Sequence, residues 1–170
     1  MTSGLVIRRA TSGDAAIIAR HRVAMFADMG FVPTDTLASQ LLDSASSSLG
    51  PELSTESYVG WLALDASNEV IAGAGIHFMP QMPRISDDRT RVVTECMPVV
   101  QNVYTEPAWR HRGVARALMA VVMEWAATHR LDRLVLQASD AGRPLYVSLG
   151  FTPTREMGWS PDRLANTTCR

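Results

Sequence analysis

One segment, residues 98–128, constrains the fold of this chain more than any other. It opens with PVVQNVYT, a continuous β-branched run that is typical of a central strand buried on both faces. A short basic turn with one glycine, WRHRG, follows, and then residues 114–128 show apolar positions at helical spacing. The apolar face of this predicted helix comprises Leu118, Val121, Val122 and Trp125. A strand that passes through a tight turn into a helix predicts an α/β arrangement here.

Patterns elsewhere predict the remaining elements. Leu5–Ala10 favours a first strand, and residues 11–30 favour a helix that Thr11 caps with Asp14 and Gly30 ends. Residues 34–50 favour a second helix that ends in a serine run, which is a loop signal. The other expected elements are a hairpin (57–65 and 69–79), a loop (80–91), a buried strand (133–138), a short helical or loop segment (141–150) and a final strand-like stretch (151–159).

This order, β-α-α-β-β-β-α-β-α-β, is neither a strict alternation nor an all-β array. It predicts an α/β (α+β) fold, with one mixed sheet flanked by helices. A length of 170 residues, without internal repeats or a linker, predicts a single domain over residues 1–170.

Composition excludes several classes of protein. Hydrophobic residues make up 46% of the chain and charged residues 19%, which is a globular balance. The net charge of −1 argues against a protein that binds nucleic acid through a globally basic surface. Cys96 and Cys169 lack metal-ligand spacing and are expected as free thiols. With no signal-peptide pattern at the start and no apolar run of about 18 residues, we expect a cytoplasmic protein without metal or membrane partner.

The basic turn before residue 114 has the chemistry of a phosphate site. The first N–H groups of a helix have no internal partner, and the helix dipole adds partial positive charge there. Gly113 would let a ligand approach the backbone, and Arg110, Arg112 and Arg116 would add charge-assisted hydrogen bonds. Neither G-x-x-x-x-G-K-[ST] nor G-x-G-x-x-G is present, so the P-loop and dinucleotide readings fail.

Two motifs in the right order resemble the GNAT superfamily of acyl-CoA-dependent N-acyltransferases. NVYTEPAWRHRGVARALM resembles its strand, pyrophosphate loop and helix, with the R-x-x-G-x-A core at Arg110, Gly113 and Ala115. LVLQASDAGRPLYVSLGF resembles its later segment, which ends in L-Y-x-x-L-G-F. The resemblance implies a central mixed, mostly antiparallel sheet that is splayed at the acyl-CoA site. It also implies acetyl-CoA as co-substrate, an amine as second substrate and a possible homodimer.

The resemblance also assigns site residues. Tyr146 would be the general acid that protonates the departing thiolate, and Ser139 stands where many relatives carry asparagine. The residues implied in coenzyme binding are Val103, Tyr104 and Thr105 along the pantetheine arm, Arg110, His111, Arg112, Gly113, Val114, Ala115 and Arg116 around the pyrophosphate, and Ser139 and Arg143 further along.

The general base is the weakest part of the assignment. An alkylammonium has a pKa of about 10.4, so its deprotonation at neutral pH needs assistance. Many relatives carry a carboxylate on the central strand, and PVVQNVYT has none. Glu95 precedes this strand, Glu106 follows it, and His77 lies on a neighbouring strand. We expect Glu95 to serve, with a water chain to bulk solvent as the alternative.

The acceptor stays open at this point. The leading hypothesis is a transfer of acetyl from acetyl-CoA to a small-molecule amine, and residues 80–91 favour a covered pocket. Alternatives are a protein N-terminal or lysine acetyltransferase and a non-catalytic acyl-CoA-binding regulator, against which the presence of Tyr146 argues. A toxin that acetylates charged tRNA is disfavoured by the near-neutral charge.

Overall fold

A computed structural model describes residues 4–32, 34–154 and 156–157. These residues form two compact units that divide after Gln137, and each unit is described by itself.

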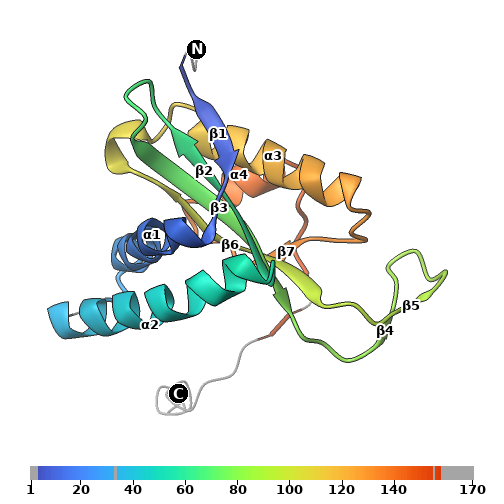
Figure 1. The fold of residues 1–170 in the computed structure, drawn as a ribbon. Coiled ribbons are helices and arrows are strands. Elements are labelled where there is room, and N and C mark those ends of the chain that lie inside the picture. Colours follow the sequence, from blue (N-terminus) through green and yellow to red (C-terminus); the bar gives the residue numbers. More distant parts are fainter. Residues whose placement is uncertain (1–3, 33, 155, 158–170) are drawn as a thin grey trace, which may run out of the picture. The chain divides into compact units, whose positions relative to one another are not determined.

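The first unit contains a five-stranded sheet in the order β1-β2-β3-β6-β7 (Figure 1). Its strands are β1 (Val6–Arg9), β2 (Tyr58–Leu64), β3 (Val70–Met79), β6 (Met97–Thr105) and β7 (Val135–Leu136). The first four pair antiparallel, and β7 runs parallel to β6. The predicted mixed, mostly antiparallel sheet flanked by helices is therefore confirmed.

Three helices flank this sheet: α1 (Ala15–Asp28), α2 (Asp35–Ser54) and α3 (Val114–Thr128). Side chains of a strand alternate between its two faces, and β2 shows which helix covers which face. Leu62 belongs to a core cluster with residues of α1 and α2, whereas Trp61 meets Trp125 of α3 edge to face at 5.6 Å. The helices α1 and α2 therefore cover one face of the sheet and α3 the other.

The start of α1 follows the predicted capping pattern. A 3-10 turn, η1 (Ser12–Asp14), leads into the helix, and the Thr11 N–H donates to the Asp14 carboxylate at 2.8 Å. Arg8 of β1 donates to both oxygens of the same carboxylate, at 2.7 and 2.9 Å. These bonds hold the pKa of Asp14 down at about 2, and they fix where the helix begins relative to the sheet.

Several expected boundaries are wrong. The helix α2 continues through the serine run to Ser54, because Ala45 and Leu49 are buried. Serine hydroxyls also donate to carbonyls of the preceding helical turn, as the Ser47 hydroxyl does to the Asp43 carbonyl at 2.8 Å. The expected loop 80–91 contains half of a small hairpin, β4 (Arg84–Ile85) with β5 (Val92–Val93).

The strands near the site also differ from expectation. Burial along β6 alternates between buried and half-buried residues, so this strand is not buried continuously on both faces. The expected strand at 133–138 shrinks to the two half-buried residues of β7. No strand forms among residues 151–154 and 156–157 of the predicted final stretch, and its other residues lie outside the described part.

Candidate functional site

The basic turn before α3, here named the arginine loop (residues 110–113), has an unusual backbone. It follows a 3-10 turn, η2 (Pro107–Trp109), and two of its residues adopt the left-handed region, His111 at φ 60° and Gly113 at φ 82°. The space around Gly113 is open, since a Cβ placed there would meet no atom within 4 Å. The glycine is therefore required by its backbone angle, and the open space leaves room for a ligand beside it.

The N-terminus of α3 carries the features expected of an anion site. The helical hydrogen bonds start with the amide of Ala117, which donates to the Gly113 carbonyl at 3.0 Å. The amides of Val114, Ala115 and Arg116 thus have no i−4 acceptor within α3. Gly113 provides no side-chain cap, and the first turn has no acidic residue. Positive partial charge at this helix end is available to a phosphate.

The two arginines of the loop have different surroundings. Arg110 turns back into the protein, where its Nε donates to the Thr105 carbonyl at 3.0 Å and its Nη2 pairs with Asp28. Its side chain therefore anchors the loop to the ends of β6 and α1, rather than offering an unshared charge as the sequence predicted. Arg112 is exposed, and its guanidinium carbon lies 5.2 Å from the centre of the Trp109 ring.

The edge of β6 that faces β7 is open over half its length. β7 pairs with β6 only at Val99 and Val100. Beyond these positions, no described strand pairs with β6 on this side as far as Thr105. Val103, Tyr104 and Thr105, the residues predicted to bind the pantetheine arm, all belong to this open stretch, in which the Thr105 carbonyl accepts the hydrogen bond from Arg110 Nε.

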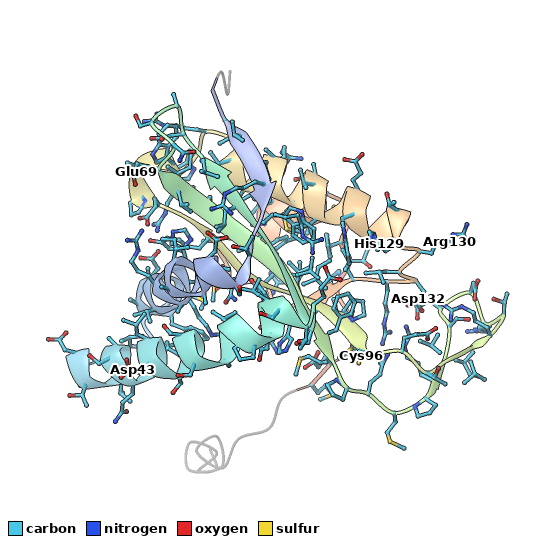
Figure 2. The ribbon with its side chains drawn as sticks, viewed as in Figure 1. Asp43, Glu69, Cys96, His129, Arg130 and Asp132 are labelled. Atoms are coloured by element: carbon cyan, nitrogen blue, oxygen red, sulfur yellow. The ribbon has the colours of Figure 1, made fainter. Side chains whose placement is uncertain are left out.

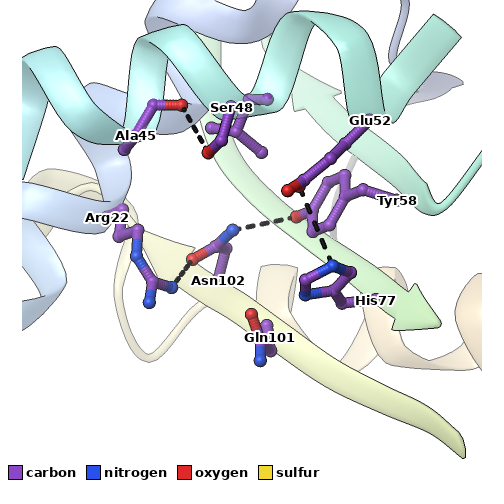
Figure 3. Close-up of a pocket in the computed structure, with 9 residues that line it drawn as sticks. Arg22, Ala45, Ser48, Glu52, Tyr58, His77, Gln101 and Asn102 are labelled. Carbon is purple, nitrogen blue, oxygen red and sulfur yellow. Dashed lines mark hydrogen bonds and ion pairs between the residues drawn. The ribbon is translucent and has the colours of Figure 1, made fainter. Parts of the chain in front are cut away.

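A β-bulge marks the point where the open edge begins. On β3, Gly73 and Gly75 are two residues apart, whereas their partners on β6, Tyr104 and Gln101, are three apart. The extra residue lies in the bulge, where Asn102 adopts φ 54° in the left-handed region. The bulge lets two consecutive side chains, Gln101 and Asn102, line the same cavity (Figure 3).

This cavity, here named the Tyr58 cavity, measures about 110 Å³ and lies on the face covered by α1 and α2. Its residues belong to α1, α2, β2, β3 and β6, and Figure 3 shows their side chains converging. The lining residues are Arg22, Ala45, Ser48, Leu49, Glu52, Tyr58, His77, Gln101 and Asn102.

A chain of hydrogen bonds crosses the cavity (Figure 3). Arg22 Nη1 donates to Asn102 Oδ1 at 2.7 Å, and Asn102 Nδ2 donates to the Tyr58 hydroxyl at 3.1 Å. Burial raises the pKa of Tyr58 to about 12, so this hydroxyl stays protonated at neutral pH. On the far side, Glu52 Oε2 lies 3.9 Å from His77 Nε2.

The Tyr58 ring packs tightly against β3 at Gly75. A Cβ added at Gly75 would lie 2.2 Å from both Cζ and Oη of Tyr58. The glycine thus makes room for the phenol ring, which fixes the Tyr58 hydroxyl beside Asn102.

The residues considered as general base lie in three different places. Glu95 is on an exposed loop, 68% of its side chain is accessible, and it does not line the Tyr58 cavity. Backbone N–H donors at Glu95 and Thr94 hold the pKa of its carboxyl below the usual value, which weakens it as a base. Glu106 pairs with buried His21 at 3.3 Å. Of these candidates, the structure brings only His77 into the cavity.

Of the polar residues that line the cavity, sequence reasoning named only His77 and missed Arg22, Ser48, Glu52, Tyr58, Gln101 and Asn102. For Glu52 a signal existed, since Ala45, Leu49 and Glu52 are spaced 4 and 3 residues apart and share one helical face. Because the serine run is interpreted as a loop, the predicted helix ends before Glu52. Arg22 and Tyr58 had no local signal, because their partner Asn102 is distant in sequence.

The second unit contains α4 (Arg143–Ser148) and the remaining predicted residues. Tyr146 is buried and meets Phe151 edge to face at 5.9 Å. Burial raises the pKa of its hydroxyl, which keeps the proton that a general acid needs. The Ser139 hydroxyl accepts a hydrogen bond from the Gly142 N–H at 3.1 Å, and the Arg143 N–H donates to the Ser139 carbonyl at 2.9 Å.

Comparison with known families decides the identity of this fold. Residues 32–151 match the model of the Acetyltransferase (GNAT) family, which is well over half of the chain. The chain belongs to the GNAT acetyltransferase family. Acetyl-CoA as acyl donor follows from this membership, and the resemblance of the two motifs is confirmed.

Solved structures support the same assignment. A GCN5-related N-acetyltransferase from Ralstonia eutropha JMP134 shares 28% sequence identity over 94% of this chain and 99% of that one, with a TM-score of 0.81. A predicted acetyltransferase from Clostridium acetobutylicum, solved with acetyl-CoA, shares 25% identity over 96% and 99% of the two chains, with a TM-score of 0.76. A search of curated proteins found no match.

Figure 2 shows the side chains of the described part of the chain, which lacks two further kinds of feature. It contains no cluster of three or more histidine, cysteine or acidic side chains placed to hold a metal ion. Its helices are all too short or too polar to cross a bilayer.

Proposed function

We propose that this GNAT protein transfers the acetyl group of acetyl-CoA to the amine of a small molecule bound in the Tyr58 cavity. The observation that carries the proposal is the position of Gln101, which lines the cavity and also begins the open edge of β6. An acyl donor on this edge and an acceptor in the cavity would share the bulge at Asn102 as a boundary.

The donor side would use the backbone. The amides at the start of α3 and the helix dipole suit the coenzyme pyrophosphate, with Arg112 in the preceding loop and Arg110 holding that loop in place. The open stretch Val103–Thr105 would bind the pantetheine arm. In the second unit, Ser139 and Arg143 remain proposed contacts, and the local hydrogen bonds of Ser139 give it a structural role as well.

The chemistry is a direct attack. The neutral amine nitrogen forms a bond to the thioester carbonyl carbon, the carbon–sulfur bond breaks, and its electron pair leaves on sulfur. The amine gives up one proton, and the thiolate takes one. We assign the base to Glu52 with His77 beside it, in place of Glu95, because the former pair lines the cavity. Tyr146, protonated at neutral pH, is proposed to supply the proton to sulfur.

The size of the cavity supports a small acceptor. Its volume of about 110 Å³ is well below that of sites for drug-sized ligands, which hold about 300–1,000 Å³. A cytoplasmic location remains a prediction from the sequence pattern, and homodimeric assembly remains a prediction from the family resemblance.

The test is thiol release from acetyl-CoA across a panel of small amines and short peptides, with acetylated products identified by mass spectrometry. We expect turnover with at least one small amine and none with peptides. Tight coenzyme A binding without acetylation of any amine would contradict the proposal and favour the regulator. Turnover confined to peptides would favour the protein acetyltransferase.

A further inference from the structure

The Tyr58 cavity has charges of opposite sign on its two sides. Figure 3 shows the guanidinium of Arg22 on one side and the Glu52–His77 pair on the other, with the Asn102–Tyr58 hydrogen bond between them. Both charges act on the Tyr58 hydroxyl, the arginine favouring its ionised form and the glutamate opposing it. A ligand that spans the cavity therefore meets a cation at one end and an anion at the other.

Arg22 differs from the arginines around it in having no acidic partner. In the described chain, ion pairs join Arg8 to Asp14, Arg9 to Glu56, Arg20 to Glu106 and Arg110 to Asp28. None of the ion pairs found among the described residues involves Arg22. Its contacts are the neutral amide of Asn102 and the ring of Phe26, 5.0 Å from the guanidinium carbon.

This arrangement leaves the charge of a half-buried arginine without compensation inside a cavity. Of the five N–H donors that a guanidinium carries, Asn102 takes one. The planar group binds a carboxylate through two parallel hydrogen bonds, which are stronger than hydrogen bonds between neutral groups. Asn102 also limits the rotation of Arg22, so less side-chain freedom is lost when an anion binds.

We propose that the acceptor is a small amino-carboxylate, with its carboxylate on Arg22 and its amine beside Glu52 and His77. The inference rests on the proposed function, since it names the substrate class of the same site. It follows from the charge order along the cavity: cation, neutral hydrogen-bonded pair, anion. An acceptor with an anion at one end and a cation at the other pairs with both Arg22 and Glu52. A simple alkylamine has no anion and leaves Arg22 without an anionic partner.

The experiment compares matched acceptors that differ only in the carboxylate, such as glycine with glycinamide and alanine with alaninamide. The value of kcat/KM for acetylation is measured for each. We expect wild type to prefer the carboxylate by about 10- to 100-fold, the range of one lost charged hydrogen bond. Arg22→Gln should lower this ratio by about tenfold or more relative to wild type, mainly through KM, and Arg22→Lys should keep part of the preference.

Arg20→Gln is the matched control, because Arg20 lies on the same helix but pairs with Glu106 outside the cavity. It should leave the ratio unchanged. Thermal unfolding checks each variant, and if Arg22→Gln does not fold, wild type and Arg22→Lys carry the test. Equal or better turnover of the amides by wild type, or an unchanged ratio in the folded Arg22 variants, overturns this inference and leaves the proposed function standing. Failure of every amine in the panel overturns both.

Discussion

The arginine loop and the Tyr58 cavity are built from different parts of the chain. The loop is contiguous, and it offers backbone amides whose direction is set by left-handed residues such as Gly113. The cavity draws its lining from α1, α2, β2, β3 and β6, and it offers side chains. Backbone recognition depends on few residue identities, whereas side-chain recognition depends on each one. The loop therefore suits a ligand shared by a family, and the cavity suits one particular to this chain.

The two regions also differ in charge. The loop and the helix end behind it carry positive charge from Arg112 and from the helix dipole, whereas Arg110 is paired with Asp28, and this positive charge suits a diphosphate. The cavity contains one arginine, one glutamate and one histidine, and its charges are separated in space (Figure 3). Changes in the loop should thus affect binding of the donor, and changes in the cavity should affect the acceptor and the rate.

The largest expected effect separates chemistry from donor binding. Glu52→Gln removes the proposed base and should lower kcat by about 100-fold or more, the contribution typical of general base catalysis. Glu95→Gln is the control and should leave kcat near the wild-type value, because Glu95 lies outside the cavity. Initial rates of thiol release measure both, and calorimetry should show unchanged acetyl-CoA affinity. A larger loss with Glu95→Gln would return the base to that residue.

The second prediction concerns the loop alone. Gly113→Val forces a β-branched residue into the left-handed region, which costs about 1–2 kcal/mol, and it should weaken acetyl-CoA binding by about tenfold or more. Gly30→Val is a matched control, since Gly30 has φ 74° and equally open surroundings, away from the loop. Calorimetric titration should show weaker binding only for Gly113→Val. Equal losses in the two variants would mean that the effect is on folding.

The third prediction tests how tightly the cavity is packed. Gly75→Ala places a methyl group against the Tyr58 ring and should reduce the free energy of unfolding by about 1–3 kcal/mol. Gly50→Ala, at a helical position with no atom within 4 Å, should raise it by about 0.5–1 kcal/mol. Urea denaturation measures both. A neutral result for Gly75→Ala would show that the Tyr58 ring moves aside easily.

The smallest expected effect concerns the stability of α1, the helix that contributes to both regions. This helix carries Arg22 of the cavity and Asp28, which anchors the loop. Asp14 stabilises the start of α1, and its pKa of about 2 lies below the value of an unfolded chain. Its contribution is therefore complete above about pH 4 and disappears as pH falls through about 2. Asp14→Asn should cost about 1 kcal/mol at neutral pH, and this cost should fade as pH falls through about 2, as measured by unfolding at several pH values. A pH-independent difference would contradict the ion-pair explanation.

Local patterns were enough to predict several elements of the fold. The helix α3 begins and ends as expected, at Val114 and Thr128, because its periodicity is strong and Gly113 precedes it. The hairpin β2–β3 and the capping of α1 were also correct, since each depends on neighbours within a few residues. The extension of α2 was missed because burial of Ala45 and Leu49 outweighs the weak helix preference of serine.

The cavity was beyond local patterns for a physical reason. Tyr58 meets Asn102 across 44 positions of sequence, and Arg22 meets the same residue across 80. Such contacts depend on the register of the sheet strands. Here the register includes a bulge, and β6 contains no glycine that would predict it. The role expected for Glu95 was assigned by sequence proximity to the central strand, which is a poor guide to which side chains enter a cavity.

The bulge at Asn102 has a consequence for how this chain can vary. Its additional residue shifts the alternation of β6, so that Gln101 and Tyr104 face the same layer although they are three positions apart. Losing one residue here would transfer every later side chain of the strand to the opposite layer, whereas exchanging Gln101 for another residue leaves that order intact. The lining of the Tyr58 cavity can therefore change through point substitution along this strand, but not through insertion or deletion.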